Sequence, residues 1–346
     1  MTTKRITQHF ANLTIKRLSL VHCLVTVSYV VFSPSASWSR EELDCTQPVK
    51  TPHEDNSADY EIETTYTYEE EGENKDINNV IFILARNHPG KPLKPILDAY
   101  ETATKIIRRN GKIQRKDCQE IEPAFLSARI GRSDEVESNR HILDDLRAAD
   151  KKHDFKRIGV ELAQIEVKNY EKERITSDQL DQVIKTCPDI AKTAKDLYLI
   201  TPGVGHSFKR EKPDVILEGL VRLDIRKVEV KLREEVKGFD ESRISPAALA
   251  LYDQFFSDHS RGISKEGDMR KIIETETSSE VKRTLEFYLP KMRKWLELGP
   301  PRNNFMAVQA IKGNGNIAII NGYGHYLGMS DSFERACKGG LDAIDQ

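Results

Sequence analysis

The sequence predicts an α/β protein in which helices surround a mixed central sheet, and two observations support this class. The run at 80–84 is continuously apolar, as expected for a strand that is buried on both faces, and further short apolar strands are predicted at 157–161, which ends on an acid, and at 317–320. Turn residues or apolar residues at helical spacing follow each run, which is the strand–loop–helix order of layered α/β folds. We therefore expect these three strands to lie in one sheet.

The first strand begins the clearest of these units. The turn Asn87–Gly90 follows it, and apolar residues then recur at helical spacing from Leu93 to Ile107. Asn110-Gly111 is a typical end for such a helix. The unit as a whole predicts a strand, a loop and a helix that covers the sheet.

In the rest of the chain, strands and helices are predicted to alternate less regularly. The section from about 170 to 298 reads as mainly helical, with one further short strand at Val215–Leu217. After the strand at 317–320, Asn321–His325 is predicted as a turn before a final helix from Ser330. We expect one α/β domain over residues 77–346.

Residues 38–76 are predicted to form an acidic, irregular leader ahead of this domain. Its end is strongly acidic from Glu69 to Asp76, and such runs are usually solvated. The alternation of apolar and polar residues from Tyr60 to Tyr68 leaves an edge strand as the alternative.

Residues 1–37 are predicted to be a secretory signal peptide. They contain four basic residues and no acidic ones, and a 15-residue run without charge, Leu18–Phe32, precedes small residues around Ser33–Ser37. The run is short for a helix that spans a bilayer, although an uncleaved signal-anchor stays open as an alternative. We expect a secreted or periplasmic protein, associated with a membrane only if the signal is not cleaved.

Removal of this segment leaves an acidic chain with four cysteines. Basic residues fall from 53 to 49 while all 55 acidic residues remain, so the formal charge becomes −6. This balance argues against nucleic acid as a partner, because phosphate binding needs a basic surface. The cysteines allow two disulfides in three pairings or isolated buried thiols, and their spacing fits no zinc ribbon.

Three side chains are candidates for a functional site at one edge of the predicted sheet. His88 and His325 follow apolar strands, and Glu161 ends another. Ligands bind at the carboxyl ends of the strands in open α/β sheets, so parallel neighbouring strands would bring these three residues together. Two imidazoles and a carboxylate form a plausible site for Mn, Co or Zn, with functional atoms about 4–8 Å apart.

Other roles for the same residues stay open. One histidine could instead act as a general base that Glu161 orients, without a metal. A histidine after a strand is also a common turn residue, and an acid at this position can cap the following helix. His206, in Gly203–His206, follows a similar turn and could join or replace His88 in this site.

The C-terminal segment resembles the TraB/GumN/Tiki family. The resemblance lies in Pro301–Ala307, with its Arg302-Asn303 pair, and in the strand that runs into Gly322-Tyr323-Gly324-His325. Two further family positions are filled by Ala85–His88, where Ala85 stands in place of the family's glycine, and by Ile158–Glu161.

This resemblance implies an α/β fold like that of the erythromycin-esterase and ChaN-like proteins. It implies that His88, Glu161 and His325 are metal-site or catalytic residues, and that Arg302 positions an acidic or carbonyl group or braces the site. An ion pair at the start of a helix is the alternative for Arg302. The function implied is a metal-dependent hydrolase of peptides or small molecules.

Two other functions are compatible with the same scaffold. One is a binding protein without catalysis, since ChaN-like relatives are associated with haem iron. The other is a metal-free esterase-like enzyme that uses histidine as its base. Metal content and haem absorbance of the purified protein would separate the three.

We expect N-terminal sequencing of the protein from its native compartment to begin near Trp38, because cleavage should follow the small residues at 33–37. A soluble cytosolic protein that still begins at Met1 would contradict the signal peptide.

Overall fold

The computed structural model describes residues 41–344, except 53–57, 87–92, 174, 201–202, 237, 261–263 and 266, and except the side chains of 170, 173, 257, 259–260 and 323–325. Contacts divide the chain into Met1–Trp38 and Ser39–Gln346, and everything described here belongs to the second unit. The signal-peptide prediction for residues 1–37 therefore lies outside the described residues. None of the described helices is long and apolar enough to cross a membrane.

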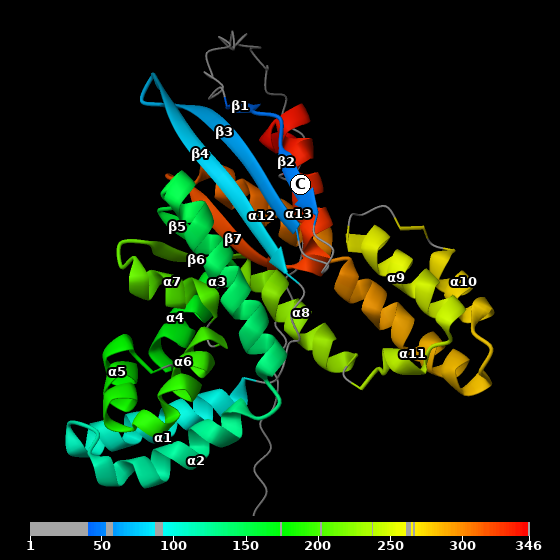
Figure 1. Ribbon diagram of the computed structural model, residues 1–346. Helices are drawn as coiled ribbons and strands as arrows, with labels where there is room; N and C mark the ends of the chain where they lie inside the picture. Colours follow the sequence, from blue (N-terminus) through cyan, green and yellow to red (C-terminus); the bar gives the residue numbers. More distant parts are fainter. Residues whose placement is uncertain are drawn as a thin grey trace, which may run out of the picture. The chain divides into compact units, whose positions relative to one another are not determined.

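A mixed seven-stranded sheet with helices on both faces forms the centre of this unit, which confirms the predicted α/β class (Figure 1). The path through the sheet is β1-β3-β4-β7-β5-β6, and β2 also pairs with β3. Strands β4, β7, β5 and β6 are parallel to one another, whereas β1, β2 and β3 make antiparallel pairs. The strands are β1 Glu42–Cys45, β2 Val49–Pro52, β3 Ala58–Glu70, β4 Glu73–Arg86, β5 Arg157–Ala163, β6 Ile216–Val221 and β7 Ile317–Gly322.

The helices between the strands fall into layers and side groups. Helices α12 and α13 pack on one face of the sheet, and α3 and α7 pack on the other. Helices α1, α2, α5 and α6 have a core of their own, as do α9, α10 and α11. The bounds are α1 Lys94–Asn110, α2 Cys118–Arg129, α3 Ser133–His153, α4 Gln164–Glu173, α5 Ser177–Thr186, α6 Ala191–Ile200, α7 Val204–Glu211, α8 Leu223–Glu235, α9 Pro246–Ser260, α10 Asp268–Thr275, α11 Ser279–Leu296, α12 Gly299–Lys312 and α13 Tyr323–Gly339, with short 3-10 turns at Arg115–Asp117, Pro188–Ile190, Glu241–Arg243 and Leu341–Ala343.

The three strands predicted from apolar runs lie side by side, as β4, β7 and β5. Their registers pair Leu84 with Ile320, and Ile320 with Val160. The predicted strand near Val215–Leu217 is present as β6. Continuous apolar runs therefore identified the strands that helices cover on both faces.

The irregular leader predicted for 38–76 is wrong for most of its length. Residues 58–70 and 73–86 form the long antiparallel hairpin β3–β4, turning at Glu71 and Gly72, which both have positive φ. Buried Tyr60 and Ile62 alternate with more exposed residues, so the alternative of a strand was correct, but β3 is not an edge strand because it pairs with β4 on one side and with β1 and β2 on the other. The acidic run misled the prediction because it lies at the exposed tip of a hairpin.

The final helix also begins earlier than predicted. Helix α13 starts at Tyr323, directly after β7, so the residues expected to form a turn before Ser330 are the end of a strand and the first turn of a helix. His325 is the third residue of this helix.

The four cysteines in the described part of the chain form two disulfides. Cys45 in β1 is bonded to Cys337 in α13, and Cys118 at the start of α2 is bonded to Cys187 at the end of α5. Of the three pairings that the sequence left open, the structure selects this one.

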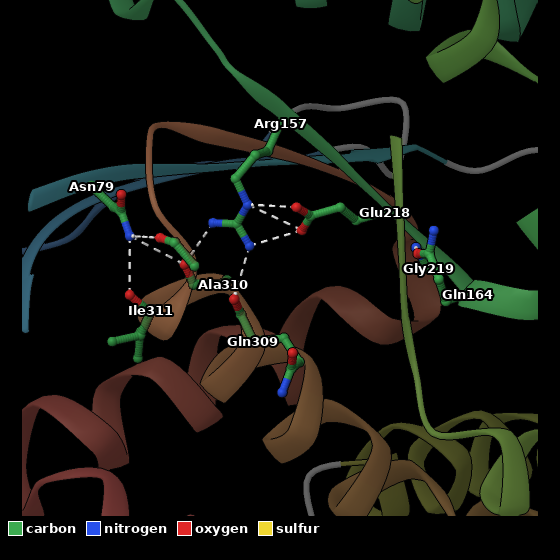
Figure 2. A network of polar contacts seen from close by, with 9 residues as sticks. Asn79, Arg157, Gln164, Glu218, Gly219, Gln309, Ala310 and Ile311 are labelled. Atoms are coloured by element: carbon green, nitrogen blue, oxygen red, sulfur yellow. Dashed lines mark hydrogen bonds and ion pairs between the residues drawn. The ribbon is translucent and has the colours of Figure 1, made fainter. Parts of the chain in front are cut away.

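A buried guanidinium joins the sheet to α12 (Figure 2). Arg157, at the start of β5, binds the Glu218 carboxylate of β6 at 2.8 Å and donates to the carbonyl oxygens of Gln309 and Ala310 at 2.9 and 3.2 Å. Asn79 of β4 donates to the Ile311 carbonyl at 3.0 Å. The last carbonyls of a helix have few partners within the helix, and only the Gln309 carbonyl also accepts from the backbone N–H of Gly313, so these contacts cap α12 from the sheet.

We expect Arg157→Met to lower the free energy of unfolding by about 3–5 kcal/mol, because Glu218 and two helix carbonyls lose a buried partner. Urea unfolding of the oxidised chain measures this loss. Arg147→Met is the control, since its ion pair with Glu211 is 43% exposed on both sides and should contribute less than about 1 kcal/mol. Equal losses in the two variants would contradict the role given to Arg157.

Candidate functional site

The carboxyl edge of the parallel strands is the candidate site, because the predicted residues are attached there. Strand β7 lies between β4 and β5, and all three run in the same direction. The segments that follow these strands therefore leave the sheet at one edge. We expected the three candidates to come together if their strands were parallel neighbours, and the strands meet this condition.

The structure describes these candidates to different extents. Glu161 lies in β5, two residues before the strand ends, and is half-buried, with one carboxylate oxygen fully covered. The backbone of His325 lies in the first turn of α13, but its side chain is not described. His88 lies outside the described residues. The separations between these three functional groups therefore stay predictions.

A row of residues crosses the sheet on the face that α12 covers. Ala85 of β4 pairs with Asn321 of β7, and the preceding inward residues of both strands belong to the core under α12 and α13. Arg157 points to the same helix, so alternation along β5 directs Glu161 to this face as well. Ala85, the residue that departs from the family pattern, is fully buried in this row.

Arg302 lies in the first turn of α12, where it takes part in a chain of buried ion pairs. It binds Glu229 of α8 at 3.2 Å, and Glu229 binds Arg226 at 2.9 Å. Arg226 in turn binds Glu166 of α4 at 3.1 Å. The ion pair that the sequence offered as the alternative for Arg302 is therefore present. Its charge is balanced inside the protein, which suits a residue that braces the site.

The electrostatics of these linked ion pairs favour the ionised forms of Glu229 and Arg226 despite their burial. Burial alone would raise the pKa of Glu229, but the charges of Arg302 and Arg226 hold it below the ordinary value of 4.5. Burial would also lower the pKa of Arg226, and its bonds to Glu229 and Glu166 raise it instead. The helix α8 carboxylate is thus a permanent anion at neutral pH.

Two buried asparagines near the edge were missed as candidates. Asn303 follows Arg302 in α12 and is fully buried, and Asn321 near the end of β7 is 2% exposed. Both lie inside the segments that carried the family resemblance. Sequence reasoning passed over them because asparagine before glycine, or at a helix start, is common without any function.

His206, the substitute for His88, lies in the first turn of α7 and is buried. Helix α7 packs on the face of the sheet opposite α12, with Val204 and Phe208 in the core beneath it. His206 lines a cavity of about 390 Å³ together with Ser177 and Lys209. It therefore belongs to a different layer from Arg302.

Cavities accompany the edge on the α12 side. One of about 460 Å³ lies beyond the ends of β5 and β6, where Ala163, Val221 and Phe305 meet. A second, of about 20 Å³, borders Arg302 and Glu229. The second has room for about one water molecule.

A possible set of metal ligands occurs elsewhere in the described part of the chain. Cys118, Glu122 and Cys187 have ligand atoms within 4.8 Å of one another. The two cysteines form a disulfide, so neither offers a thiolate to a metal. This group therefore has a structural role.

Comparisons with known proteins leave the family open. No protein-family model and no curated protein matches the chain. A solved structure of an erythromycin esterase mutant, EreC, in its open conformation is similar with a TM-score of 0.19 and 15% identity. The likeness covers 51% of this chain and about half, 55%, of that one. A likeness this weak carries no inference about the site.

We expect Glu229→Gln to lower the free energy of unfolding at neutral pH by about 2–5 kcal/mol, since two arginines lose their buried anion. The folded pKa of Glu229 lies below 4.5, so its contribution is complete above that value and is lost as the pH falls through it toward the folded pKa. Denaturant titrations between about pH 3 and 7 should therefore show a shallower acid loss in the variant.

Glu137→Gln is the control for this titration, because Glu137 is 72% exposed and its contact with His141 is long, at 3.9 Å. Its pH profile should match that of the unmodified chain. If Glu229→Gln also matched it, the buried ion chain would not stabilise the fold.

Proposed function

We propose that this protein is an exported, metal-dependent hydrolase with its active site at the carboxyl edge of β4, β7 and β5. The observation that carries the proposal is the parallel adjacency of these strands, because Glu161 lies near the end of β5 and the segments bearing His88 and His325 follow β4 and β7 at the same edge. The resemblance of these segments to the TraB/GumN/Tiki family supports the same assignment. The substrate proposed is a peptide or a small molecule with a hydrolysable bond.

Each residue has a proposed role. His88, Glu161 and His325 would hold a divalent ion such as Mn, Co or Zn, and a bound ion supplies a water of lowered pKa. Glu161 suits the role of ligand or base because solvent reaches its half-buried side chain on β5. Arg302 would act as a positioning residue, since its ion pair with Glu229 fixes the start of α12 beside the edge.

Export is proposed from the N-terminal segment, and the disulfides support it. The cysteines joined as Cys45–Cys337 and Cys118–Cys187 are the four that would remain after signal cleavage. Disulfides persist in secreted and periplasmic proteins and are rare in a reducing cytosol. Disulfides and a cleaved signal peptide are therefore both expected in a secreted or periplasmic protein.

Elemental analysis of protein purified without added metal tests the function directly. We expect about one Mn, Co or Zn per chain, and His325→Ala and Glu161→Gln should each abolish metal uptake and reduce turnover at least about 100-fold. The circular-dichroism spectrum and melting temperature should change little in His325→Ala.

His141→Ala is the matched control, because this histidine is 70% exposed on α3 and should affect neither metal nor turnover. Haem absorbance in place of a divalent ion would favour a binding protein. Turnover without any metal would favour a histidine-based esterase.

A further inference from the structure

A cavity of about 550 Å³ is lined by both residues of the disulfide Cys45–Cys337. Cys45 is the last residue of β1, Cys337 lies in the last turn of α13, and both are half-buried, so solvent reaches them. Sites for small molecules in proteins have volumes of about 300–1,000 Å³, and this cavity falls within that range. A small solute therefore has both room and access beside this S–S bond.

The second disulfide has a different environment. Cys118 is 6% exposed and Cys187 is fully buried, and both belong to the core that helices α1, α2, α5 and α6 share. Exchange between a thiol and a disulfide requires that the thiolate reach one of the two sulfurs. Access therefore favours reaction at the Cys45–Cys337 bond.

Charge in the cavity favours a reagent that carries a negative group. The charged residues that line it are Lys50, Lys338 and Glu334. Lys50 is paired with Glu334, whereas Lys338 has no ion pair within the described residues. An unbalanced cation attracts an anionic molecule and stabilises a thiolate nearby. A thiol that also bears a carboxylate matches this cavity better than a neutral or cationic thiol.

We propose that the Cys45–Cys337 disulfide is an exchange site for a small thiol that carries a carboxylate. The thiolate of this molecule attacks one sulfur of the pair, and a new S–S bond forms between them as the protein's S–S bond breaks. The other cysteine sulfur leaves with the bonding electron pair as a thiolate and takes a proton from water. The products are a mixed disulfide and one cysteine thiol, so the small thiol is the only co-reactant. The site uses none of the residues assigned to the hydrolase.

The mixed disulfide persists only if the freed cysteine moves away, because a thiolate that stays beside it attacks it again. The element that can move is β1, which has four residues and lies at one end of the sheet. Glu42 and Asp44 are exposed, and Leu43 and Cys45 are half-buried against the core. Short elements with few buried contacts open at a low cost in free energy. Strand β1 can therefore carry Cys45 away from α13.

Peptide mass spectrometry of the oxidised full chain tests the site, with 3-mercaptopropionate as the probe. After an acid quench and alkylation of free thiols, we expect mixed disulfides and alkylated thiols to accumulate at Cys45 and Cys337 at least about ten-fold faster than at Cys118 and Cys187. In urea the two disulfides should react at similar rates, because the fold no longer restricts access. Equal rates in the native chain, or faster reaction at Cys118–Cys187, would overturn the proposal.

The preference for a carboxylate is measured with three thiols: 3-mercaptopropionate, 2-mercaptoethanol and cysteamine, which are anionic, neutral and cationic. Each rate is divided by the rate of the same thiol with bis(2-hydroxyethyl) disulfide, which removes differences in intrinsic reactivity. At low ionic strength the relative rates should fall in that order, by at least about three-fold from first to last, and about 0.5 M salt should reduce the difference. No difference, or the reverse order, would reject an acidic thiol as the ligand.

Variants separate recognition of charge from access. Lys338→Gln should lower the relative rate of 3-mercaptopropionate about two- to five-fold and that of 2-mercaptoethanol less, and an equal effect on both would contradict recognition of the carboxylate. Lys294→Gln, at an exposed position on α11, is the control and should change neither rate. The double variant Cys45→Ser/Cys337→Ser should lose the fast reaction, and a fast reaction that remained would contradict the assignment. Should this variant fail to fold, the peptides of the unmodified chain still decide the outcome.

Discussion

The rest of the structure depends on the buried guanidinium of Arg157. Its ion pair with Glu218 joins β5 to β6, and its bonds to the Gln309 and Ala310 carbonyls fix the end of α12 against the sheet. A buried cation is unfavourable unless it is paired and fully hydrogen-bonded, so this group tolerates few arrangements of strand and helix. Gly313 belongs to the same constraint, since a Cβ atom there would lie 2.0 Å from the guanidinium.

Because the last turn of α12 is fixed against the sheet, the position of its first turn is fixed as well. The helix begins near the carboxyl edge of the parallel strands, where Arg302 meets Glu229 of α8. Burial opposes the charges of Glu229 and Arg226, and their ion-pair partners outweigh that effect. The start of α12, the end of β5 and the start of α8 therefore hold one another in register around the candidate site.

Parts of the site follow from local sequence, and parts do not. Glu161 was predictable because it ends an apolar run, and such runs form the strands at the centre of an α/β sheet. The partner of Arg302 was not, since Glu229 lies 73 residues away and no local pattern connects them. Asn303 and Asn321 stand in the recognised motifs, yet only the packing shows that both are buried and that their polar atoms have no hydrogen bond within the described residues.

The sequence by itself determined the α/β class and the three central strands, because strands covered on both faces need continuous apolar residues. It did not determine the hairpin β3–β4, where one face is only half-buried and an acidic tip weakens that signal. Tertiary structure alone decided the pairing of Cys45 with Cys337, 292 residues apart, and the layer in which His206 lies. These features depend on contacts between distant segments, and hydrophobic periodicity describes only the local face that each segment buries.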